Sequence, residues 1–331
     1  MFNNQTILVT GATGSFGKCF IKTVLEKYSP ERLIVFSRDE LKQFEMQQEF
    51  REHLDVLRFF LGDVRDQERL NRAFNGVDIV VHAAALKQVE AAEYNPFETV
   101  KTNVLGSENI IHAAILNNVK KVIALSTDKA VNPVNLYGAT KLASEKLFIA
   151  GNNYVGKECP TRFSVVRYGN VIGSRGSVIP LFMRLKETGR LPITDERMTR
   201  FWITIEGAVN FVLESISDMR GGEIFVPKMP TTNIIDLAKA IAPDCKIDLI
   251  GIRPGEKLHE ALIMADESRH AVEQETRYVI QSPALYRNVE QHDGSKVPDQ
   301  FSYASDNLDQ RLSIAEIQTM INAFVPAGVN V

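Results

Sequence analysis

Short apolar runs alternate with longer amphipathic stretches along the first half of the chain. Residues 6–10, 32–36, 56–61 and 78–82 are rich in large apolar residues, and a polar or glycine-containing turn follows each run. Runs of this length bounded by turns are typical of buried strands. The stretches between them have the length of helices, and strands that alternate with helices predict a doubly wound α/β fold with a parallel sheet.

The alternation continues further along the chain. Residues 97–116 have helical periodicity, and residues 120–125 and 163–167 are predicted strands. A looser stretch that contains several glycines then follows. We therefore expect a first domain over residues 1–170 and a smaller second domain over residues 171–331, partly interleaved with the first.

Three glycines at a spacing of three separate the first predicted strand from a helical pattern. Glycines allow a tight turn and a close approach of the backbone to a pyrophosphate, and the helix N-terminus that follows attracts the anion. Such a triplet could be an ordinary turn, but its place between a strand and a helix favours a dinucleotide site of Rossmann type. The residues expected to contact the cofactor here are Gly11, Thr13, Gly14, Ser15, Phe16 and Gly17.

The end of the second strand bears on which dinucleotide is expected. A site for NAD usually has a carboxylate there for the ribose 2′-hydroxyl. This chain has Ser37 and Arg38, with Lys42 one turn further. A guanidinium and a hydroxyl suit a 2′-phosphate better, which favours NADP over NAD and makes the first domain NADP-binding. Asp39 could instead be the ribose ligand, or these charges could simply begin a solvated helix.

The next two strand ends offer further cofactor contacts. Asp63 and Val64 could border the adenine, and the small residue Ala83 would let the cofactor lie close to the backbone. Tight packing alone would also explain alanines at this place. His82 stands inside an apolar strand, so we expect a packed rather than a catalytic histidine.

The strand at residues 120–125 leads into the strongest candidate chemistry. Thr127, Asp128 and Lys129 follow it, and Tyr137 and Lys141 come next at a spacing of four, which places them on one face of a helix. A nearby ammonium favours phenolate over phenol, and a tyrosine tuned in this way can take a proton from an alcohol. Alternatively, Tyr137 and Lys141 could belong to an ordinary amphipathic helix, and Asp128 and Lys129 could form an exposed ion pair in a loop.

The composition of the chain mainly argues against certain classes of partner. The 331 residues suggest about two domains, and a net charge of −3 from 38 basic and 41 acidic residues gives no basic field for nucleic acid. The three cysteines lie far apart, which indicates reduced thiols, and no metal-type spacing occurs. No apolar run approaches the roughly 18 residues of a membrane span, and the chain enters its first strand directly. We expect a cytoplasmic protein without metal, nucleic-acid or membrane partners.

The glycine motif, the Tyr137–Lys141 pair and the strand order resemble the extended short-chain dehydrogenase/reductases that act on nucleotide sugars. Within them, several segments resemble the inverting UDP-N-acetylglucosamine 4,6-dehydratases that begin pseudaminic acid synthesis. These segments are 37–43 (SRDELKQ), 82–87 (HAAALK), 126–130 (STDKA), 167–171 (RYGNV), 173–178 (GSRGSV), 198–202 (MTRFW) and 251–259 (GIRPGEKLH). The resemblance extends to about residue 265, and the Thr-Asp-Lys triplet is its most specific part.

The resemblance implies dehydration of UDP-N-acetylglucosamine across C4 to C6 with inversion at C5, through internal hydride transfer via NADP. Lys129 would be the C5 base and Asp128 the acid for the C6 oxygen. Tyr137 would act at the C4 hydroxyl beside Thr127, and Lys141 would also hold the nicotinamide ribose. We expect neighbouring cations such as Lys141, together with partial burial, to lower the pKa of Lys129. The resemblance also implies a homo-oligomer, a hexamer, and a product destined for flagellin or surface glycan.

Candidate substrate residues stand mostly in the second half of the chain. Strand tips and helix starts there could meet a diphosphate, and an arginine fork could bind phosphate or ribose. Each residue alone could be a capping or loop residue, whereas Val171 is expected beside the cofactor. The substrate set is Lys87, Asn170, Arg175, Val178, Thr194, Arg253 and Glu256. Residues 281–331 carry no chemistry that we can identify.

Three other functions remain open at this stage. A C4 epimerase or a C5-retaining 4,6-dehydratase could use the same scaffold, and only the dehydratases give a 6-deoxy product. A nucleotide-sugar-sensing NADP-binding regulator is the non-enzymatic alternative. The presence of Tyr137, Lys141, Asp128 and Lys129 together argues against the regulator.

Overall fold

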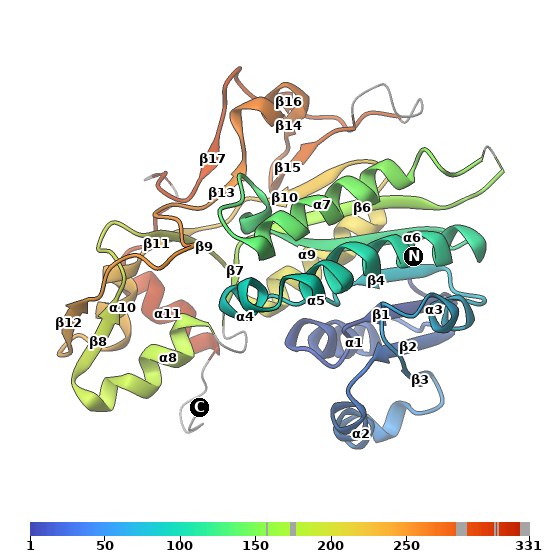
Figure 1. Cartoon of the computed structure of the whole chain (residues 1–331), viewed down its shortest axis with the longest axis horizontal. Coiled ribbons are helices and arrows are strands. Elements are labelled where there is room, and N and C mark those ends of the chain that lie inside the picture. The colour runs from blue at the N-terminus through green and yellow to red at the C-terminus, as the bar shows by residue number, and fades with distance from the viewer. Residues whose placement is uncertain (157, 173–176, 283–289, 308, 310, 325–331) are drawn as a thin grey trace.

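A ten-stranded sheet forms the centre of the computed structural model, which describes residues 1–156, 158–172, 177–282, 290–307, 309 and 311–324 (Figure 1). Across the sheet the strands are β16 (Ser295–Lys296), β14 (Ala271–Glu273), β15 (Arg277–Ile280), β10 (Ile224–Pro227), β6 (Arg162–Tyr168), β5 (Lys121–Thr127), β4 (Ile79–His82), β1 (Thr6–Thr10), β2 (Arg32–Ser37) and β3 (Leu57–Leu61). The strands from β10 to β3 pair in parallel, and β15, β14 and β16 add antiparallel pairs. The prediction of a doubly wound parallel fold is therefore confirmed.

The central strands are apolar along their whole length because both faces of the sheet are covered. All residues of β1 and of β4 are buried. The register of β5 on β6 pairs Val122 with Phe163 and Thr127 with Tyr168. Because these strands are parallel, the polar residues that follow them lie at one edge of the sheet.

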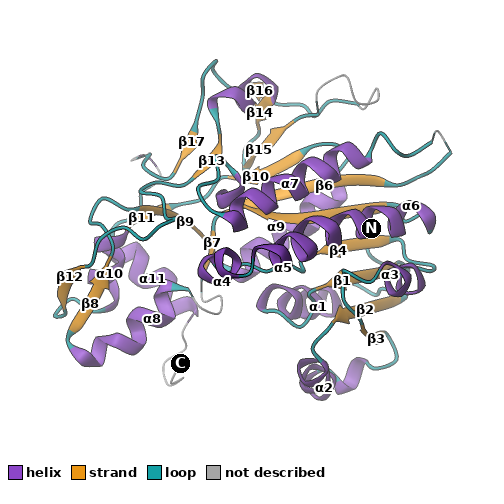
Figure 2. Ribbon diagram, in the orientation of Figure 1, coloured by secondary structure: helices purple, strands orange, loops and turns teal. Residues whose placement is uncertain are grey.

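Helices cover the two faces of the sheet (Figure 2). On one face α1 (Ser15–Lys27) packs against α9 (Ile205–Asp218), and on the other α6 (Gly106–Leu116) packs against α3 (Gln67–Ala73) and α7 (Leu136–Gly151). The remaining helices of this part are α2 (Glu40–Glu49), α4 (Val89–Tyr94) and α5 (Pro96–Val100). A π-helical turn, Lys101–Leu105, joins α5 to α6 within the region predicted to be helical.

A smaller part of the molecule lies beside one end of the large sheet. It contains α8 (Val178–Leu185), α10 (Ile234–Ile241), α11 (Ile314–Phe324) and the pair β8 (Arg190–Ile193) and β12 (Lys246–Leu249). Its own apolar clusters centre on Trp202 and Phe182. The short strands between the two parts are β7 (Asn170–Val171), β9 (Thr199–Ile203), β11 (Thr231–Asn233), β13 (Ala261–Ile263) and β17 (Tyr303–Ala304).

The division at residue 170 stays a prediction. Strands β10, β14, β15 and β16 come from beyond that residue, yet they belong to the large sheet. No helix among the described residues is long and apolar enough to cross a membrane. The described residues also contain no group of three or more His, Cys, Asp or Glu side chains that could hold a metal ion.

Candidate active site

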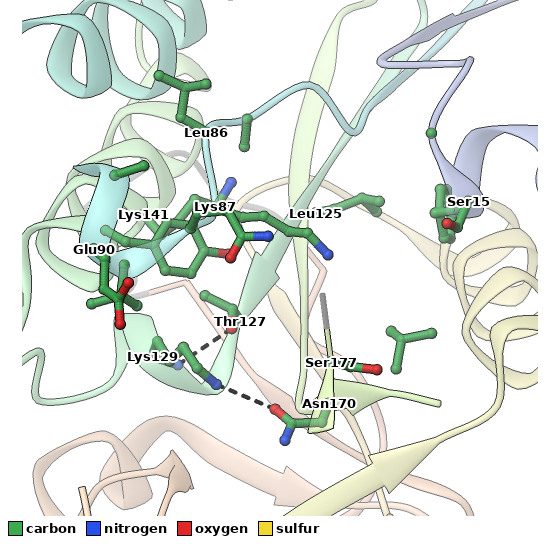
Figure 3. A pocket seen from close by; sticks show the side chains of 18 of the residues that line it. Ser15, Leu86, Lys87, Glu90, Leu125, Thr127, Lys129, Lys141, Asn170 and Ser177 are labelled. Carbon is green, nitrogen blue, oxygen red and sulfur yellow. Dashed lines mark hydrogen bonds between the residues drawn. The ribbon is translucent and has the colours of Figure 1, made fainter. Parts of the chain in front are cut away.

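A cavity of about 1180 Å³ lies at the carboxyl edge of the parallel strands, beside the smaller part of the molecule. In Figure 3, Ser15 lies on one side of this space and Lys87, Lys129 and Lys141 lie on the other. The predicted residues along its wall are Gly11, Thr13, Gly14, Ser15, Phe16, Gly17, Ser37, Arg38, Lys42, Asp63, Val64, Ala83, Lys87, Thr127, Lys129, Tyr137, Lys141, Asn170, Val171, Val178, Thr194, Arg253 and Glu256. Asp128 lies behind the wall and is fully buried, and Arg175 lies outside the described residues.

The glycine turn leaves no room for side chains. A Cβ atom added to Gly11, whose φ is +65°, would lie 2.9 Å from the Cα atom of Ala84. At Gly17 an added Cβ would lie 2.4 Å from the Cα atom of Ala12. Gly14 is the N-cap of α1 and offers no side-chain cap, so the first-turn N–H groups can meet an anion in the cavity.

The residues expected at the adenosine end form a connected set. The Gln43 amide donates to the carbonyl of buried Ser37 at 2.9 Å. The Arg38 side chain is 57% exposed, and its guanidinium lies 3.7 Å from Asp63. Asp39 caps α2 by accepting from the Lys42 N–H at 3.0 Å, and its side chain also pairs with the Lys42 ammonium. The sequence analysis offered Asp39 as a ribose ligand or as a charge at the start of a solvated helix. In the structure Asp39 caps that helix.

The π-helical turn positions the loop that carries Lys87. Asn103, which is buried in this turn, accepts from the Leu86 N–H and donates to the Leu86 carbonyl, both at 2.9 Å. The same amide donates to Thr140 of α7 at 3.0 Å. Extra residues in a helix often occur at functional sites, and here the distortion fixes the cavity wall. His82 nearby is buried and contacts Thr10 at 2.9 Å, as expected of a packed histidine.

Helix α7 holds Tyr137 and Lys141 on its buried face. Asn135 caps the helix by accepting from the Gly138 N–H at 2.8 Å. A Cβ atom at Gly138 would lie 2.1 Å from the carbonyl oxygen of Lys129, so the helix start presses directly on the Asp128–Ala130 turn. Glycine at this position brings the Tyr137 ring beside the residues that follow β5.

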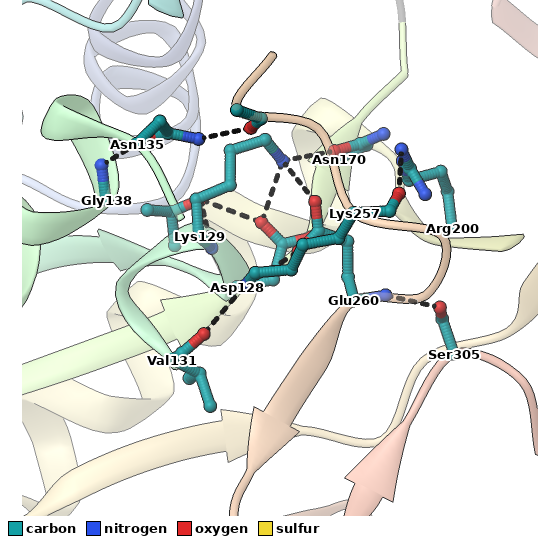
Figure 4. Close-up of polar contacts among 12 residues, drawn as sticks. Asp128, Lys129, Val131, Asn135, Gly138, Asn170, Arg200, Lys257, Glu260 and Ser305 are labelled. Carbon is teal, nitrogen blue, oxygen red and sulfur yellow. Dashed lines mark hydrogen bonds and ion pairs between the residues drawn. The ribbon is translucent and has the colours of Figure 1, made fainter. Parts of the chain in front are cut away.

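Lys129 is surrounded by acceptors from three parts of the chain (Figure 4). Its ammonium donates to Asp128 Oδ1 at 3.0 Å and to Asn170 Oδ1 at 3.3 Å, and it lies 3.6 Å from Glu260 Oε1. Thr127 donates to the same Asp128 oxygen at 2.9 Å. The Thr-Asp-Lys triplet is therefore a hydrogen-bonded network around a buried carboxylate at the cavity wall and not an exposed loop ion pair.

The expected lowering of the pKa of Lys129 is wrong. Burial and Arg200 act to lower this pKa, but the carboxylates of Asp128 and Glu260 outweigh them and raise it above its ordinary value. Lys141 does not act on Lys129 in the way that we expected. The pKa shift of Lys129 has the opposite sign to the one expected because Glu260 is far from Lys129 in the sequence. The motif gave no indication that this carboxylate lies beside the Lys129 amine.

The lowered pKa expected for Tyr137 is also wrong for this structure. Burial raises the pKa of Tyr137 to about 12, although Lys129 and a hydrogen bond with Thr127 act to lower it. Burial lowers the pKa of Lys141 to about 8, against the opposing charge of Glu145. The lysine is thus partly neutral near pH 8, and its charge is a weaker influence on the phenol than the motif suggests.

The predicted substrate residues from the second half of the chain also line the cavity. Arg253 is 51% exposed and lies 3.7 Å from Glu90, and Glu256 accepts from the Arg253 N–H at 3.4 Å. Thr194 donates to the sulfur of Met198 at 2.9 Å. Val178 begins α8, whose N-cap makes no side-chain hydrogen bond, so its first N–H groups remain available to an anion.

Among the charged residues of the wall that sequence reasoning missed are Arg200, Lys257 and Glu260. All three stand in or beside segments whose resemblance to nucleotide-sugar enzymes was recognised, residues 198–202 and 251–259. The signal was therefore present, but no local spacing linked these residues to Lys129. Contacts between β13 and the Asp128–Ala130 turn bring Glu260 to Lys129, and β9 carries Arg200.

Comparison with known proteins agrees with this architecture. A family model described as "Polysaccharide biosynthesis protein" matches residues 7–282. A UDP-N-acetylglucosamine 4,6-dehydratase (inverting) from Campylobacter jejuni is 55% identical over 97% of this chain and 98% of its own length. A UDP-glucose 4-epimerase from Rickettsia canadensis is 41% identical over 97% of this chain and 96% of its own length. The X-ray structure of Pen from Bacillus thuringiensis has 39% identity, covers 97% of this chain and 99% of that chain, and has a TM-score of 0.88.

These matches span nearly the whole chain, including the glycine turn, the Tyr137–Lys141 pair and the segments around the cavity. The resemblance drawn from the motifs is thereby confirmed. The chain belongs to the polysaccharide biosynthesis protein family of extended short-chain dehydrogenase/reductases, which it shares with the inverting UDP-N-acetylglucosamine 4,6-dehydratases.

Proposed function

We propose that this protein is an NADP-dependent UDP-N-acetylglucosamine 4,6-dehydratase that inverts C5 and forms UDP-2-acetamido-2,6-dideoxy-β-L-arabino-hex-4-ulose. The observation that carries this proposal is one cavity that contains the glycine turn, the Tyr137–Lys141 pair and the Lys129 end of the Asp128–Lys129 pair. The 55% identical relative with this activity in its name supports the same substrate and reaction.

A nicotinamide dinucleotide fits the residues that line the sheet edge. The glycine turn admits a pyrophosphate against uncapped N–H groups, and Ser37 and Arg38, which line the same cavity, would hold a ribose 2′-phosphate. When bound, the cofactor supplies what no side chain can, by accepting a hydride from one sugar carbon and returning it to another. The proposal of NADP over NAD rests on Arg38 and on the engagement of Asp39 with Lys42.

Tyr137 and Thr127 provide proton transfer at C4. Tyr137 takes the C4 hydroxyl proton, and its hydrogen bond with Thr127 favours the phenolate that this step requires. The Thr127 hydroxyl has a single proton, so it donates to the Tyr137 phenolate and, once Tyr137 is protonated, donates instead to Asp128 at 2.9 Å. A proton gained by Tyr137 can thus pass through the Thr127 hydroxyl to Asp128, which needs one for the next step.

Lys129 and Asp128 carry out the elimination. The C4 ketone acidifies the C5 proton, which the neutral Lys129 amine removes as the C5–H bond breaks and an N–H bond forms. The C6–O bond breaks as the C6 oxygen gains a proton, and water leaves. Asp128 lies behind the wall and reaches the cavity through the Thr127 hydroxyl, so its proton follows that route. With the hydride returned to C6, protonation of C5 by Lys129 on the face opposite to the one that lost the proton gives the inverted centre.

Cellular context and assembly follow from the resemblance alone. We propose a cytoplasmic homo-oligomer, a hexamer, whose product enters pseudaminic acid synthesis for flagellin or surface glycan. The division into an NADP-binding part over residues 1–170 and a substrate-binding part over residues 171–331 belongs to the same proposal.

The identity of the product tests this function. Purified protein with UDP-N-acetylglucosamine should give a 6-deoxy-4-keto sugar, seen by proton NMR as a new C6 methyl signal. The relative named as a UDP-glucose 4-epimerase makes C4 epimerisation the specific rival. UDP-N-acetylgalactosamine as the main product, with no methyl signal, would contradict the proposal.

A further inference from the structure

The ammonium of Lys129 has one acceptor for each of its three N–H donors. Asp128 supplies the first at 3.0 Å, Asn170 the second at 3.3 Å and Glu260 a looser third at 3.6 Å. Asp128 and Asn170 follow neighbouring strands of the large sheet, whereas Glu260 precedes β13. The proposed reaction gives Glu260 no role, although its side chain lines the cavity.

Both the backbone and the carboxylate of Glu260 make polar contacts. Its N–H donates to Ser305 Oγ at 2.9 Å, and its carbonyl accepts from the Ser305 N–H at 2.7 Å. Its second carboxylate oxygen lies 3.3 Å from the ammonium of Lys257, which itself donates to the Val131 carbonyl at 2.7 Å. The residue is only 3% exposed, and a buried carboxylate is unfavourable unless it is paired.

We propose that Glu260 is a positioning residue of the dehydration, which fixes the Lys129 amine at the cavity wall and stabilises the ammonium that forms when Lys129 takes the C5 proton. This inference rests on the proposed function. The proton moves from C5 to Lys129 Nζ and the electrons of the C–H bond stay on the sugar, so Glu260 neither gains nor loses a proton. A carboxylate that orients a base and stabilises its charged form has the same role in Ser-His-Asp triads.

The charges that face Lys129 come from several elements. Asp128 belongs to its own turn, Glu260 precedes β13 and Arg200 belongs to β9. Lys87 and Tyr137 also interact with it electrostatically. Asp128 and Glu260 are the two carboxylates that favour the ammonium, so removal of the Glu260 charge should leave a weaker base held by one carboxylate.

The substitution Glu260→Gln isolates the charge. It retains the side-chain size and both backbone bonds to Ser305, but the amide cannot stabilise an ammonium as a carboxylate does. We expect the rise of kcat/KM for 6-deoxy product formation with pH to level off about 1–3 pH units lower than in the unsubstituted protein. We expect kcat to fall more than KM changes, and Glu260→Asp, which keeps the charge, to recover part of the shift. The matched control Glu275→Gln alters an exposed carboxylate and should leave the profile unchanged.

A second measurement follows the protonation of the Lys129 amine in the absence of turnover. The pH dependence of acetylation of Lys129 by acetic anhydride, followed by peptide mass spectrometry, reports when its amine becomes neutral. Glu260→Gln should move this transition to lower pH, and Glu275→Gln should not. Identical Lys129 transitions and pH profiles in Glu260→Gln and the unsubstituted protein would overturn the inference and leave Glu260 a structural residue. Absence of 6-deoxy product from the unsubstituted protein would instead overturn the proposed function, while the acetylation experiment still decides the Glu260–Lys129 coupling.

Discussion

Asp128 is the residue that most clearly separates elimination from simple epimerisation. It is fully buried, and one carboxylate oxygen binds both Thr127 and Lys129 while the other meets no hydrogen-bond partner among the described residues. In the proposed reaction, oxidation at C4 uses Tyr137 and not this carboxyl group. Asp128 is therefore assigned to the loss of the C6 oxygen, for which it uses the proton that it gains through Thr127.

Asp128→Asn should keep C4 oxidation and lose elimination. The amide has nearly the same size but cannot donate an acidic proton, so 6-deoxy product should fall by about 10²–10⁴-fold. Stopped-flow absorbance should still show transient reduced nicotinamide, because the C4 step is intact. Asp299→Asn, at an exposed position, is the matched control. Unchanged product formation by Asp128→Asn would refute the assignment.

Arg38 is predicted to select the phosphorylated cofactor. Its side chain is 57% exposed and lies 3.7 Å from Asp63, so a 2′-phosphate can replace that loose contact. In protein stripped of cofactor, Arg38→Ala should weaken NADP about 10- to 100-fold, the effect of losing one charge-assisted hydrogen bond, and NAD much less. Arg51→Ala, also exposed, serves as control in the same titration. Equal losses for both cofactors would assign Arg38 to the fold or the adenine.

Lys129 should impose a rising pH dependence. Its pKa is raised above the ordinary value of 10.5 by Asp128 and Glu260, which outweigh burial, and only the neutral amine can take the C5 proton. The neutral fraction increases about tenfold per pH unit below that pKa, and kcat/KM reports the free enzyme. At saturating cofactor, kcat/KM should therefore rise between about pH 6 and pH 9. A flat or falling profile over this range, with the fold intact by circular dichroism, is the contrary result.

At the scale of elements, the turn between β1 and α1 depends on close backbone contact. Gly17→Ala would place a Cβ atom 2.4 Å from Ala12, and the atoms that it meets are backbone atoms that cannot rotate away. We expect a loss of about 1–3 kcal/mol or more in the free energy of unfolding, measured by urea denaturation. Gly156→Ala, where no atom lies within 4 Å of the added Cβ, should be nearly neutral. Similar stability of the two variants would show that the turn relaxes easily.

The elements that sequence reasoning could predict are those with local signals. Buried parallel strands are continuous apolar runs, and the glycine turn and the Tyr137–Lys141 spacing lie within single strand–helix units. The π-helical turn at Lys101–Leu105 gave no such signal, because a π-turn is defined by its i→i+5 backbone hydrogen bonds and not by a characteristic set of residue types. Its role in fixing Leu86 depends on the Asn103 amide, which is a tertiary contact.

At the scale of the whole molecule, the site is completed by chain far from its motifs. Glu260 reaches Lys129 because β13 packs beside the Asp128–Ala130 turn, Arg200 acts on Lys129 from β9, and Ser305 anchors Glu260 from the C-terminal segment. Residues 281–331 carried no recognisable chemistry, yet part of this segment holds a wall of the cavity. The signs of the Lys129 and Tyr137 pKa shifts were unpredictable for the same reason, since burial and distant charges determine them.

The proposed reaction has three steps in one cavity. A hydride leaves C4, the C5 proton passes to an exchangeable amine, and the hydride taken from C4 returns to C6. Turnover of UDP-N-acetylglucosamine in D2O, followed by proton NMR and mass spectrometry of the product, tests these steps together. We predict deuterium at C5, delivered from Lys129, and a C6 methyl group that contains only protium. Deuterium in the methyl group would contradict internal return of the hydride, and a 6-deoxy product without deuterium at C5 would contradict proton exchange through Lys129.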